Sequence, residues 1–567
     1  MDDTTSNCKN KIISNDYADF FVEFSKVRPY VRPETEFCIT SINDRYGIIH
    51  LQRMGNPPLN IETYSYSAIP HLYALLDTTS MEQSGILQAQ NQPVLNLKGQ
   101  GVMIGFIDTG IDYTNSVFRN SSGESRITAI WDQTIQDGKS PEGIDYGSVY
   151  TNAMINEALN ADDPYSVVPS RDEDGHGTFN AGIAAGSADT ANDFVGAAPE
   201  TAIAMVKLKP AKEYLRDFNF IREEAIAYQE TDIIMGVKYL TQLREELGLP
   251  LVIYIGLGTN QGYHAGFSML EQYLMSIANN AGIVVITAAG NEANMRHHFM
   301  GRITEAKGNE SVEIRVAEGE RGFALELWAD LPELYSIAIL SPTGELVPRI
   351  PARVGQSTVL NFLLEDTVIY VDYRIVEVTS GRQLILMRFQ NPTPGVWSIQ
   401  VYNSQYTTGV YNMWLPITGF ISPDTAFMRP NPNITVTSPS TAPGIICIGG
   451  YNHRNGSIYL NSGRGYSAVN VIKPDLVAPA VDVYGPGLNG RYVERTGTSV
   501  AAAHAAGAAA SLLTWGILRN NDPYMDTQDV RAYMIRGAIR SSDISYPNEV
   551  WGFGILNLYN IFDILRG

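Results

Sequence analysis

Three motifs, widely spaced along the chain, place an acid, a base and a nucleophile in contexts that suit catalysis. Asp108 follows the apolar run 102–107, His176 lies between two glycines, and Ser499 precedes an alanine-rich stretch. A serine hydroxyl becomes a good nucleophile when a histidine takes its proton, and a buried carboxylate holds the imidazolium that forms. The motifs predict acyl transfer with Asp108, His176 and Ser499 as catalytic residues.

Each motif also has an ordinary structural interpretation. Serine is a common helix N-cap, so on the stretch 497–507 alone a cap and a nucleophile explain Ser499 equally well. An aspartate at a strand end, such as Asp108, often only caps the next turn. The glycines beside His176 favour function, because glycine at a helix start gives up stability for close approach. The co-occurrence of all three motifs favours catalysis.

Asn291 is a candidate for a fourth part of the site. It lies in the segment 288–292, directly after the apolar run 283–287. Acyl transfer creates an oxyanion, and an asparagine N–H can stabilise it beside the backbone N–H of Ser499; one such donor typically contributes about 2.7–4 kcal/mol. An isolated asparagine at a strand end is usually a turn residue, but beside the other motifs we predict an oxyanion-hole residue.

Continuous apolar runs precede several of these motifs and indicate strands that are buried on both faces of a parallel sheet. The runs cover 102–107, 201–208, 251–255 and 283–287. Amphipathic segments at 233–246 and 267–281 lie between them and predict helices. The alternation predicts an α/β fold: a doubly wound, mostly parallel sheet with helices on both faces. Catalytic groups should gather at the carboxyl ends of its strands.

The pattern changes outside this α/β region. Short runs of period two, separated by turn residues, predict an all-β, jelly-roll-like insertion over 300–430. The beginning of the chain has the character of a separate α+β module. We therefore expect four segments: the module at 1–76, a first α/β part at 77–299, the β insertion, and a second α/β part at 431–567.

The composition argues against some partners. The chain has 567 residues, with 40 basic and 60 acidic side chains and a formal charge of −20. A chain this acidic, without a basic run, is a poor candidate for binding nucleic acid or anionic membrane. The most membrane-like stretch follows Ser499, but its residues are small and we expect a buried core helix.

The N-terminus has no apolar region typical of a signal peptide, so we expect cytoplasmic synthesis, which is compatible with packaging into a spore and does not exclude secretion. Cys8, Cys38 and Cys447 are far apart and predict reduced thiols, with no disulfide framework. The pair His297-His298 resembles a metal site, but adjacent residues point in different directions, and a surface loop is the better interpretation. We predict no metal and no cofactor.

The motifs together resemble those of the subtilisin-family serine proteases, and most closely those of the clostridial germination proteases. The order Asp, His, Ser agrees with that family, and the matching segments are 102–110, 174–178, 290–292, 473–479 and 497–510. The resemblance implies a serine endopeptidase that cleaves protein or peptide substrates and is made as a self-processing zymogen. It also implies a hypothesis for its role, the activation of a spore-cortex hydrolase. The alternative is a pseudoprotease, a regulatory binding subunit on the same fold.

The resemblance further implies where substrate binds. The segment 255–260, with Gly256, Leu257 and Gly258, should pair with an extended substrate, and 206–208, ending in Leu208, should form the opposite edge. Gly256 stands where the family commonly has serine. Val500 and Ala503 likewise stand where methionine and proline are usual, and alanine should leave a more regular helix.

The same resemblance gives residues 1–76 the role of a prodomain, an intramolecular chaperone and inhibitor whose end lies in the active-site cleft as a product-like strand. We expect self-cleavage near Leu76-Asp77, with Tyr73 in the P4 pocket.

Overall fold

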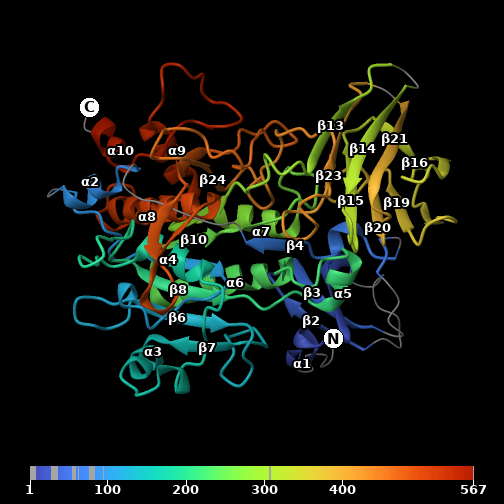
Figure 1. The fold of residues 1–567 in the computed structure, drawn as a ribbon. Coiled ribbons are helices and arrows are strands. Elements are labelled where there is room, and N and C mark those ends of the chain that lie inside the picture. The colour runs from blue at the N-terminus through green and yellow to red at the C-terminus, as the bar shows by residue number, and fades with distance from the viewer. Residues whose placement is uncertain are drawn as a thin grey trace.

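A single large sheet organises the computed structural model, which describes residues 8–26, 36–53, 59–61, 63–75, 84–92, 95–305, 308–405 and 407–565 (Figure 1). The sheet has the strand order β25-β24-β12-β10-β5-β8-β6-β7. Every neighbouring pair is parallel except β6 and β7 at one edge. The strands are β5 (Met103–Asp108), β6 (Ile127–Asp132), β7 (Ser148–Thr151), β8 (Ala202–Lys207), β10 (Leu251–Ile255), β12 (Ile283–Ala288), β24 (Ile446–Tyr451) and β25 (Leu476–Pro479). The predicted large parallel sheet is confirmed.

Helices cover both faces of this sheet. Helices α4 (His176–Ala185) and α8 (Thr498–Leu513) pack on one face, and α6 (Glu230–Leu247) and α7 (Met269–Ala278) pack on the other. Strand β5 shows why its sequence is continuously apolar: Phe106 belongs to the core under α4 and α8, whereas the next residue, Ile107, belongs to the core under α6 and α7. Further helices of the α/β part are α2 (Ile86–Asn91), α3 (Asn152–Leu159), α5 (Glu213–Phe218), α9 (Thr527–Gly537) and α10 (Leu558–Leu565), and a hairpin joins β26 (Val483–Pro486) to β27 (Tyr492–Arg495).

A small N-terminal module packs against the α6 and α7 side. It contains α1 (Lys9–Ile13) and an antiparallel sheet of order β1-β3-β2, with β1 (Tyr17–Glu23), β2 (Phe37–Ser41) and β3 (Tyr46–Gln52). Phe21 and Ile48 share a core with side chains of both helices. Cys8 and Cys38 form a disulfide, so the prediction of three reduced thiols is wrong for this pair. The fold of the module brings their Cα atoms to 5.8 Å, which a separation of 30 residues does not reveal.

Between β12 and β24 the described chain forms two antiparallel sheets. One has the order β13-β22-β15-β20-β19-β18 and the other β17-β16-β21-β14-β23. A shared core lies between them and includes Phe323, Ile337 and Trp397. The strands are β13 (His298–Arg302), β14 (Asn309–Val316), β15 (Gly322–Ala329), β16 (Leu334–Leu340), β17 (Leu346–Ile350), β18 (Ser357–Asn361), β19 (Val368–Arg374), β20 (Gln383–Gln390), β21 (Gly395–Gln405), β22 (Val410–Trp414) and β23 (Ala426–Phe427). The assignment as a jelly-roll insertion, and the four segment boundaries, stay predictions.

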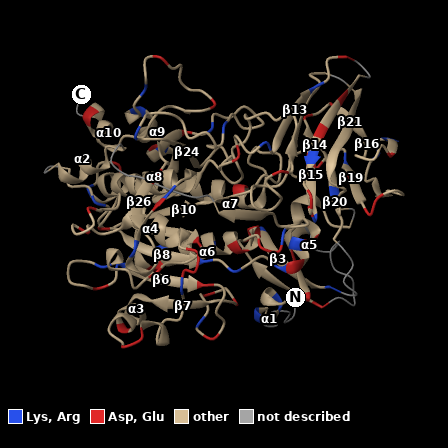
Figure 2. Ribbon diagram, in the orientation of Figure 1, with Lys and Arg blue, Asp and Glu red and all other residues tan. Residues whose placement is uncertain are grey.

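One helical stretch in the described chain, Thr498–Leu518, is long and apolar enough to span a membrane by length and composition. However, 89% of its most apolar window is buried inside the protein, where α8 contacts β10, β12 and β24. In Figure 2, acidic and basic residues are interspersed over the loops of this view rather than gathered on one basic face. That the chain binds neither nucleic acid nor membrane stays a prediction.

Candidate active site

The fold brings the four predicted chemical groups to one edge of the sheet. Asp108 is the last residue of β5, and Asn291 follows β12, so both lie at carboxyl ends of parallel strands. His176 is the first residue of α4 and Ser499 is the second residue of α8. Because α4 and α8 pack against each other over the same face, segments almost 400 residues apart in the chain meet here.

Asp108 and His176 form a buried pair. His176 Nδ1 lies 2.7 Å from Asp108 Oδ1, and both side chains are almost entirely inaccessible to solvent. Because a carboxylate can only accept, the ring nitrogen donates in this bond. A Cβ built on Gly177 would lie 2.1 Å from the carbonyl oxygen of Gly110. Glycine at this position therefore lets the start of α4 approach the turn after β5.

Asp172, which the sequence analysis did not single out, holds the two turns together. Its Oδ1 accepts from Thr109 Oγ1 at 2.8 Å, on the Asp108 side. Its Oδ2 accepts from Thr178 Oγ1 at 2.6 Å and from the backbone N–H of Thr178 at 2.9 Å, on the His176 side. Burial raises the pKa of Asp172. The sequence signal that could have revealed Asp172 is its place two residues before Asp174, the first residue of the histidine motif at 174–178.

Asn180 is a further neighbour of the histidine that the sequence analysis missed. Its Nδ2 lies 3.2 Å from each ring nitrogen of His176. The two residues are four positions apart on α4, so they share one face of the helix.

Ser499 does not serve as a helix cap. The N-cap of α8 is Gly497, which has no side chain to make a capping hydrogen bond, and Ser499 is the second residue of the helix. Ser499 is fully buried, and its Oγ has no hydrogen-bond partner among the described residues. Asn291 holds the adjacent residue, because its Oδ1 accepts from both the backbone N–H and the hydroxyl of Thr498, each at 3.1 Å. The asparagine amide is thereby oriented at the first turn of α8.

After the N-terminal module, the chain adds a short strand that lies in the cleft between two other strands of the α/β domain. Strand β4 (Leu72–Leu75) pairs antiparallel with β11 (Leu257–Gly258) on one side and with β9 (Tyr228–Gln229) on the other. The expectation that 206–208 forms the second edge is wrong for β4. Val206 and Lys207 end β8 in the central sheet and Leu208 follows it, whereas the long segment after them returns to supply β9, the edge that pairs with β4. A contact of 206–208 with substrate stays a prediction. Gly256 immediately precedes β11.

The register of β4 orders its side chains along the cleft. Ala74 lies opposite Gly258, Leu75 opposite Leu257, and Tyr73 opposite Tyr228. Tyr73 is fully buried, and its hydroxyl lies 3.5 Å from Ser438 Oγ. The predicted cleavage residues Leu76 and Asp77 lie outside the described residues.

The sequence of this chain matches a known protein family. A family model described as the subtilase family (Peptidase_S8) matches residues 99–315 and 424–554, which together make up more than half of the chain. The chain belongs to the subtilase family. It is thus a member of the subtilisin-like serine proteases, which are endopeptidases and hydrolases.

Two named relatives agree with this assignment. The solved structure of the Clostridium perfringens CspB protease matches with a TM-score of 0.76 and 32% identity, over 86% of this chain and 97% of that one. The subtilisin-like protease SBT3.3 of Arabidopsis thaliana is 27% identical over 239 residues. That second match spans 39% of this chain and only 29% of the plant protein.

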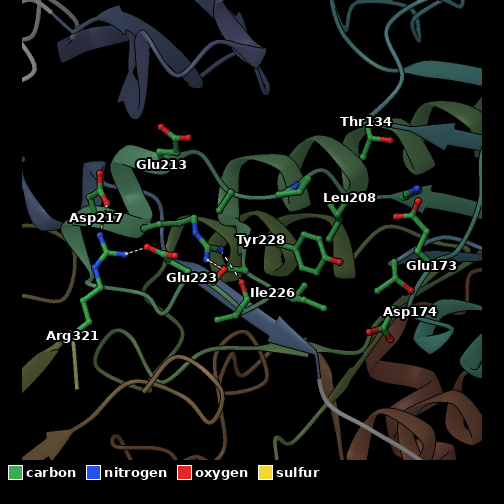
Figure 3. A pocket seen from close by; sticks show the side chains of 17 residues that line it. Thr134, Glu173, Asp174, Leu208, Glu213, Asp217, Glu223, Ile226, Tyr228 and Arg321 are labelled. Atoms are coloured by element: carbon green, nitrogen blue, oxygen red, sulfur yellow. Dashed lines mark hydrogen bonds and ion pairs between the residues drawn. The ribbon is translucent and has the colours of Figure 1, made fainter. Parts of the chain in front are cut away.

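A cavity of about 950 Å³ adjoins the cleft of this subtilase. Figure 3 shows Leu208 and Tyr228 lining it together with Asp174, the second residue before the catalytic candidate His176. Arg216 stabilises the loop 222–225, which forms part of the cavity lining, because its guanidinium donates hydrogen bonds to backbone carbonyls of this loop. Leu208 is thus placed at the cavity rather than on a strand that pairs with β4. The lining residues are Thr109, Thr134, Glu173, Asp174, Lys207, Leu208, Pro210, Ala211, Glu213, Arg216, Asp217, Glu223, Ala225, Ile226, Ala227, Tyr228 and Arg321.

His297 and His298 do not lie in a surface loop, so that prediction is wrong. Both are buried, and His297 Nδ1 donates to Glu292 Oε2 at 2.7 Å. Burial alone would raise the pKa of Glu292, but His297 holds it below its usual range. The partner carboxylate was missed because Glu292 is five residues away across a turn. No group of three or more potential metal ligands occurs among the described residues.

Proposed function

We propose that this subtilase is an active serine endopeptidase with the triad Asp108, His176 and Ser499. The observation that carries the proposal is the buried 2.7 Å bond between His176 and Asp108 at the cleft that holds β4. Ser499 lies at the start of α8 with its hydroxyl uncommitted to any capping role. The alternative, a binding subunit without catalysis, has no supporting observation among these residues.

The geometry supports a division of roles in acyl transfer. Asp108 accepts from Nδ1 of His176, which leaves Nε2 as the nitrogen that takes the proton of Ser499 Oγ. The oxygen then attacks the scissile carbonyl, and the imidazolium returns its proton to the leaving amine. In the second half of the reaction, His176 takes a proton from a water, and the water oxygen attacks the acyl carbonyl. The imidazolium then returns the proton to Ser499 Oγ as the acyl group leaves as a carboxylic acid.

Asn291 and the backbone N–H of Ser499 are the donors we propose for the oxyanion. Asn291 Oδ1 is already engaged by Thr498, so its Nδ2 is the atom left to donate. The N-terminal turn of α8 adds backbone donors and the positive end of the helix dipole. Both effects act only when negative charge develops, so they should lower the barrier more than they improve substrate binding.

We further propose that the N-terminal module is a prodomain that occupies the cleft as a product-like strand. The pairing of Ala74 with Gly258, Leu75 with Leu257 and Tyr73 with Tyr228 supports this proposal. In the proposed register Tyr73 would occupy P4, Ala74 would occupy P3 and Leu75 would occupy P2. Counting one residue on, self-cleavage would separate Leu76 from Asp77. The antiparallel pairing on both sides of β4 is how an extended peptide is bound by a sheet edge.

Two measurements test the activity and the self-processing. Purified protein is reacted with a fluorophosphonate probe, and its intact mass is compared with that of Ser499→Ala. We expect labelling of the wild type, and cleavage near residue 76 in the wild type alone. Two fragments from Ser499→Ala would exclude self-processing, and an unlabelled, folded wild type would support the pseudoprotease instead.

For the cellular role, we propose that this protein is packaged with the spore and activates a spore-cortex hydrolase. The likeness to the CspB protease supports this proposal. Incubation of an inactive cortex-hydrolase precursor with the wild type or Ser499→Ala tests this. Only the wild type should convert the precursor to a discrete, active product. General degradation of unrelated proteins at a similar rate would contradict the role and indicate a broad-specificity protease.

A further inference from the structure

Tyr254 connects the central sheet to the residue proposed as the nucleophile. It lies on β10, between β5 and β12, and is completely buried. Its hydroxyl donates a hydrogen bond of 2.9 Å to the backbone carbonyl of Ser499. The ring packs against Phe106 with the centroids 5.3 Å apart, which defines where the hydroxyl points.

The same hydroxyl accounts for a departure of this chain from the subtilase pattern. A Cβ built on Gly256 would lie 2.2 Å from Tyr254 Oη and 2.9 Å from Cζ, so only glycine fits there. Gly256 is the residue before β11, the edge that pairs with β4. One hydroxyl group therefore touches both the edge that binds an extended peptide and the backbone of Ser499.

Ser499 is held by its backbone, since its side chain makes no hydrogen bond among the described residues. On its N-terminal side, Asn291 binds Thr498. On its C-terminal side, Tyr254 binds the carbonyl of the Ser499–Val500 peptide. With both adjacent peptides anchored, the Cα–Cβ bond of Ser499, and hence Oγ, is directed by the sheet as well as by the helix.

We propose that Tyr254 is a positioning residue that orients Ser499 for attack and couples this orientation to the substrate edge at Gly256. The proposal rests on the proposed function, because it assigns Tyr254 a role in the same acyl transfer. It does not make Tyr254 a catalytic residue, since the contact of its hydroxyl is with the backbone carbonyl of Ser499 and not with the reacting Oγ. The competing interpretation is a core tyrosine whose hydroxyl only satisfies its own hydrogen-bonding need.

The first experiment compares Tyr254→Phe with a matched control, Tyr239→Phe. Tyr239 is also a buried tyrosine, on α6, but its hydroxyl has no hydrogen-bond partner in the part of the chain that the structure describes. For Tyr254→Phe we expect kcat and the rate of fluorophosphonate labelling to fall about 5-fold, the equivalent of one hydrogen bond, with KM unchanged. The control should keep the wild-type rates. The carbonyl of Ser499 keeps the N–H of Ala503 as a helical partner, so Tm should change little.

A double-mutant cycle provides the second measurement. Gly256→Ala places a methyl group on the Tyr254 hydroxyl, so it should reduce kcat strongly in the wild type. The loss should be smaller in the Tyr254→Phe background, where the nearest atom is at 2.9 Å instead of 2.2 Å. Equal losses in the two backgrounds would contradict the coupling.

The outcomes separate the two proposals. A wild type that labels normally, with Tyr254→Phe indistinguishable from Tyr239→Phe, overturns the positioning role alone. A change in KM or Tm without a change in kcat also overturns it, because a structural tyrosine would give that result. A folded wild type that does not label overturns the proposed function, and the positioning role with it.

Discussion

Asp19→Asn perturbs a buried charge at the boundary between the N-terminal module and the α/β domain. Asp19 lies on β1 and is almost inaccessible to solvent. Its Oδ1 accepts from Lys212 Nζ at 2.8 Å and from His50 Nδ1 at 2.6 Å. Its Oδ2 accepts from Gln229 Nε2 at 2.8 Å, and Gln229 belongs to β9, one of the two edges that hold β4. The carboxylate thus joins the module to the cleft.

The size of the effect follows from what the substitution leaves behind. Lys212 stays buried without its counter-ion, and removing one partner of a buried ion pair typically costs about 3–5 kcal/mol. Divided by about 1.4 kcal/mol per decade, this is roughly a 10²- to 4 × 10³-fold change in the equilibrium for undocking the module. The control is Asp44→Asn, an exposed aspartate in the same module, which should change stability by less than about 0.5 kcal/mol.

Denaturant unfolding measures this cost, with both substitutions made in the Ser499→Ala background to prevent proteolysis. Burial alone would raise the pKa of Asp19, but Lys212 and His50 hold it well below its usual range. Because the folded-state pKa is lowered, the carboxylate stabilises the fold fully above the unfolded-state value of about 3.9, and this stabilisation is lost as the pH falls below it. Asp19→Asn should therefore remove part of the acid sensitivity. A cost within 1 kcal/mol of the Asp44→Asn cost would refute the reasoning.

Two further substitutions probe the candidate triad. Asp108→Asn should lower kcat about 10⁴-fold with little change in KM, because the amide no longer holds the imidazole in the productive tautomer. Steady-state assays, with Ser499→Ala as the inactive reference, measure this loss. A loss below tenfold would contradict the triad. Gly177→Ala should reduce kcat and Tm together, since its Cβ would meet backbone at 2.1 Å; a fully active variant with wild-type Tm would show that α4 can shift without harm.

The chemistry was predictable where it depends on local sequence. Asp108 follows a continuously apolar strand and Ser499 begins an alanine-rich helix, so their elements could be assigned from nearby residues. The choice between a helix cap and a free hydroxyl for Ser499 was not local. It depended on Gly497 being the N-cap and on Asn291, in the loop after β12, binding Thr498.

Three contacts were missed for one physical reason, whether their partners are near or far in the chain. The Cys8–Cys38 disulfide, the Glu292–His297 pair across a turn and the supply of β9 by the long segment after β8 each depend on how the chain turns back on itself. Periodicity and motif spacing report which face a residue lies on, but not which distant residue will face it.

By itself, the sequence determined the α/β alternation, because apolar periodicity and turn residues act over a few positions, and it singled out the four candidate groups at 108, 176, 291 and 499. Only the tertiary structure decided how the serine is held. The contact of Tyr254 with the carbonyl of Ser499 spans 245 residues, and it exists because a sheet strand and a helix start pack within hydrogen-bond distance. Such a contact is set by packing, which no short stretch of sequence contains.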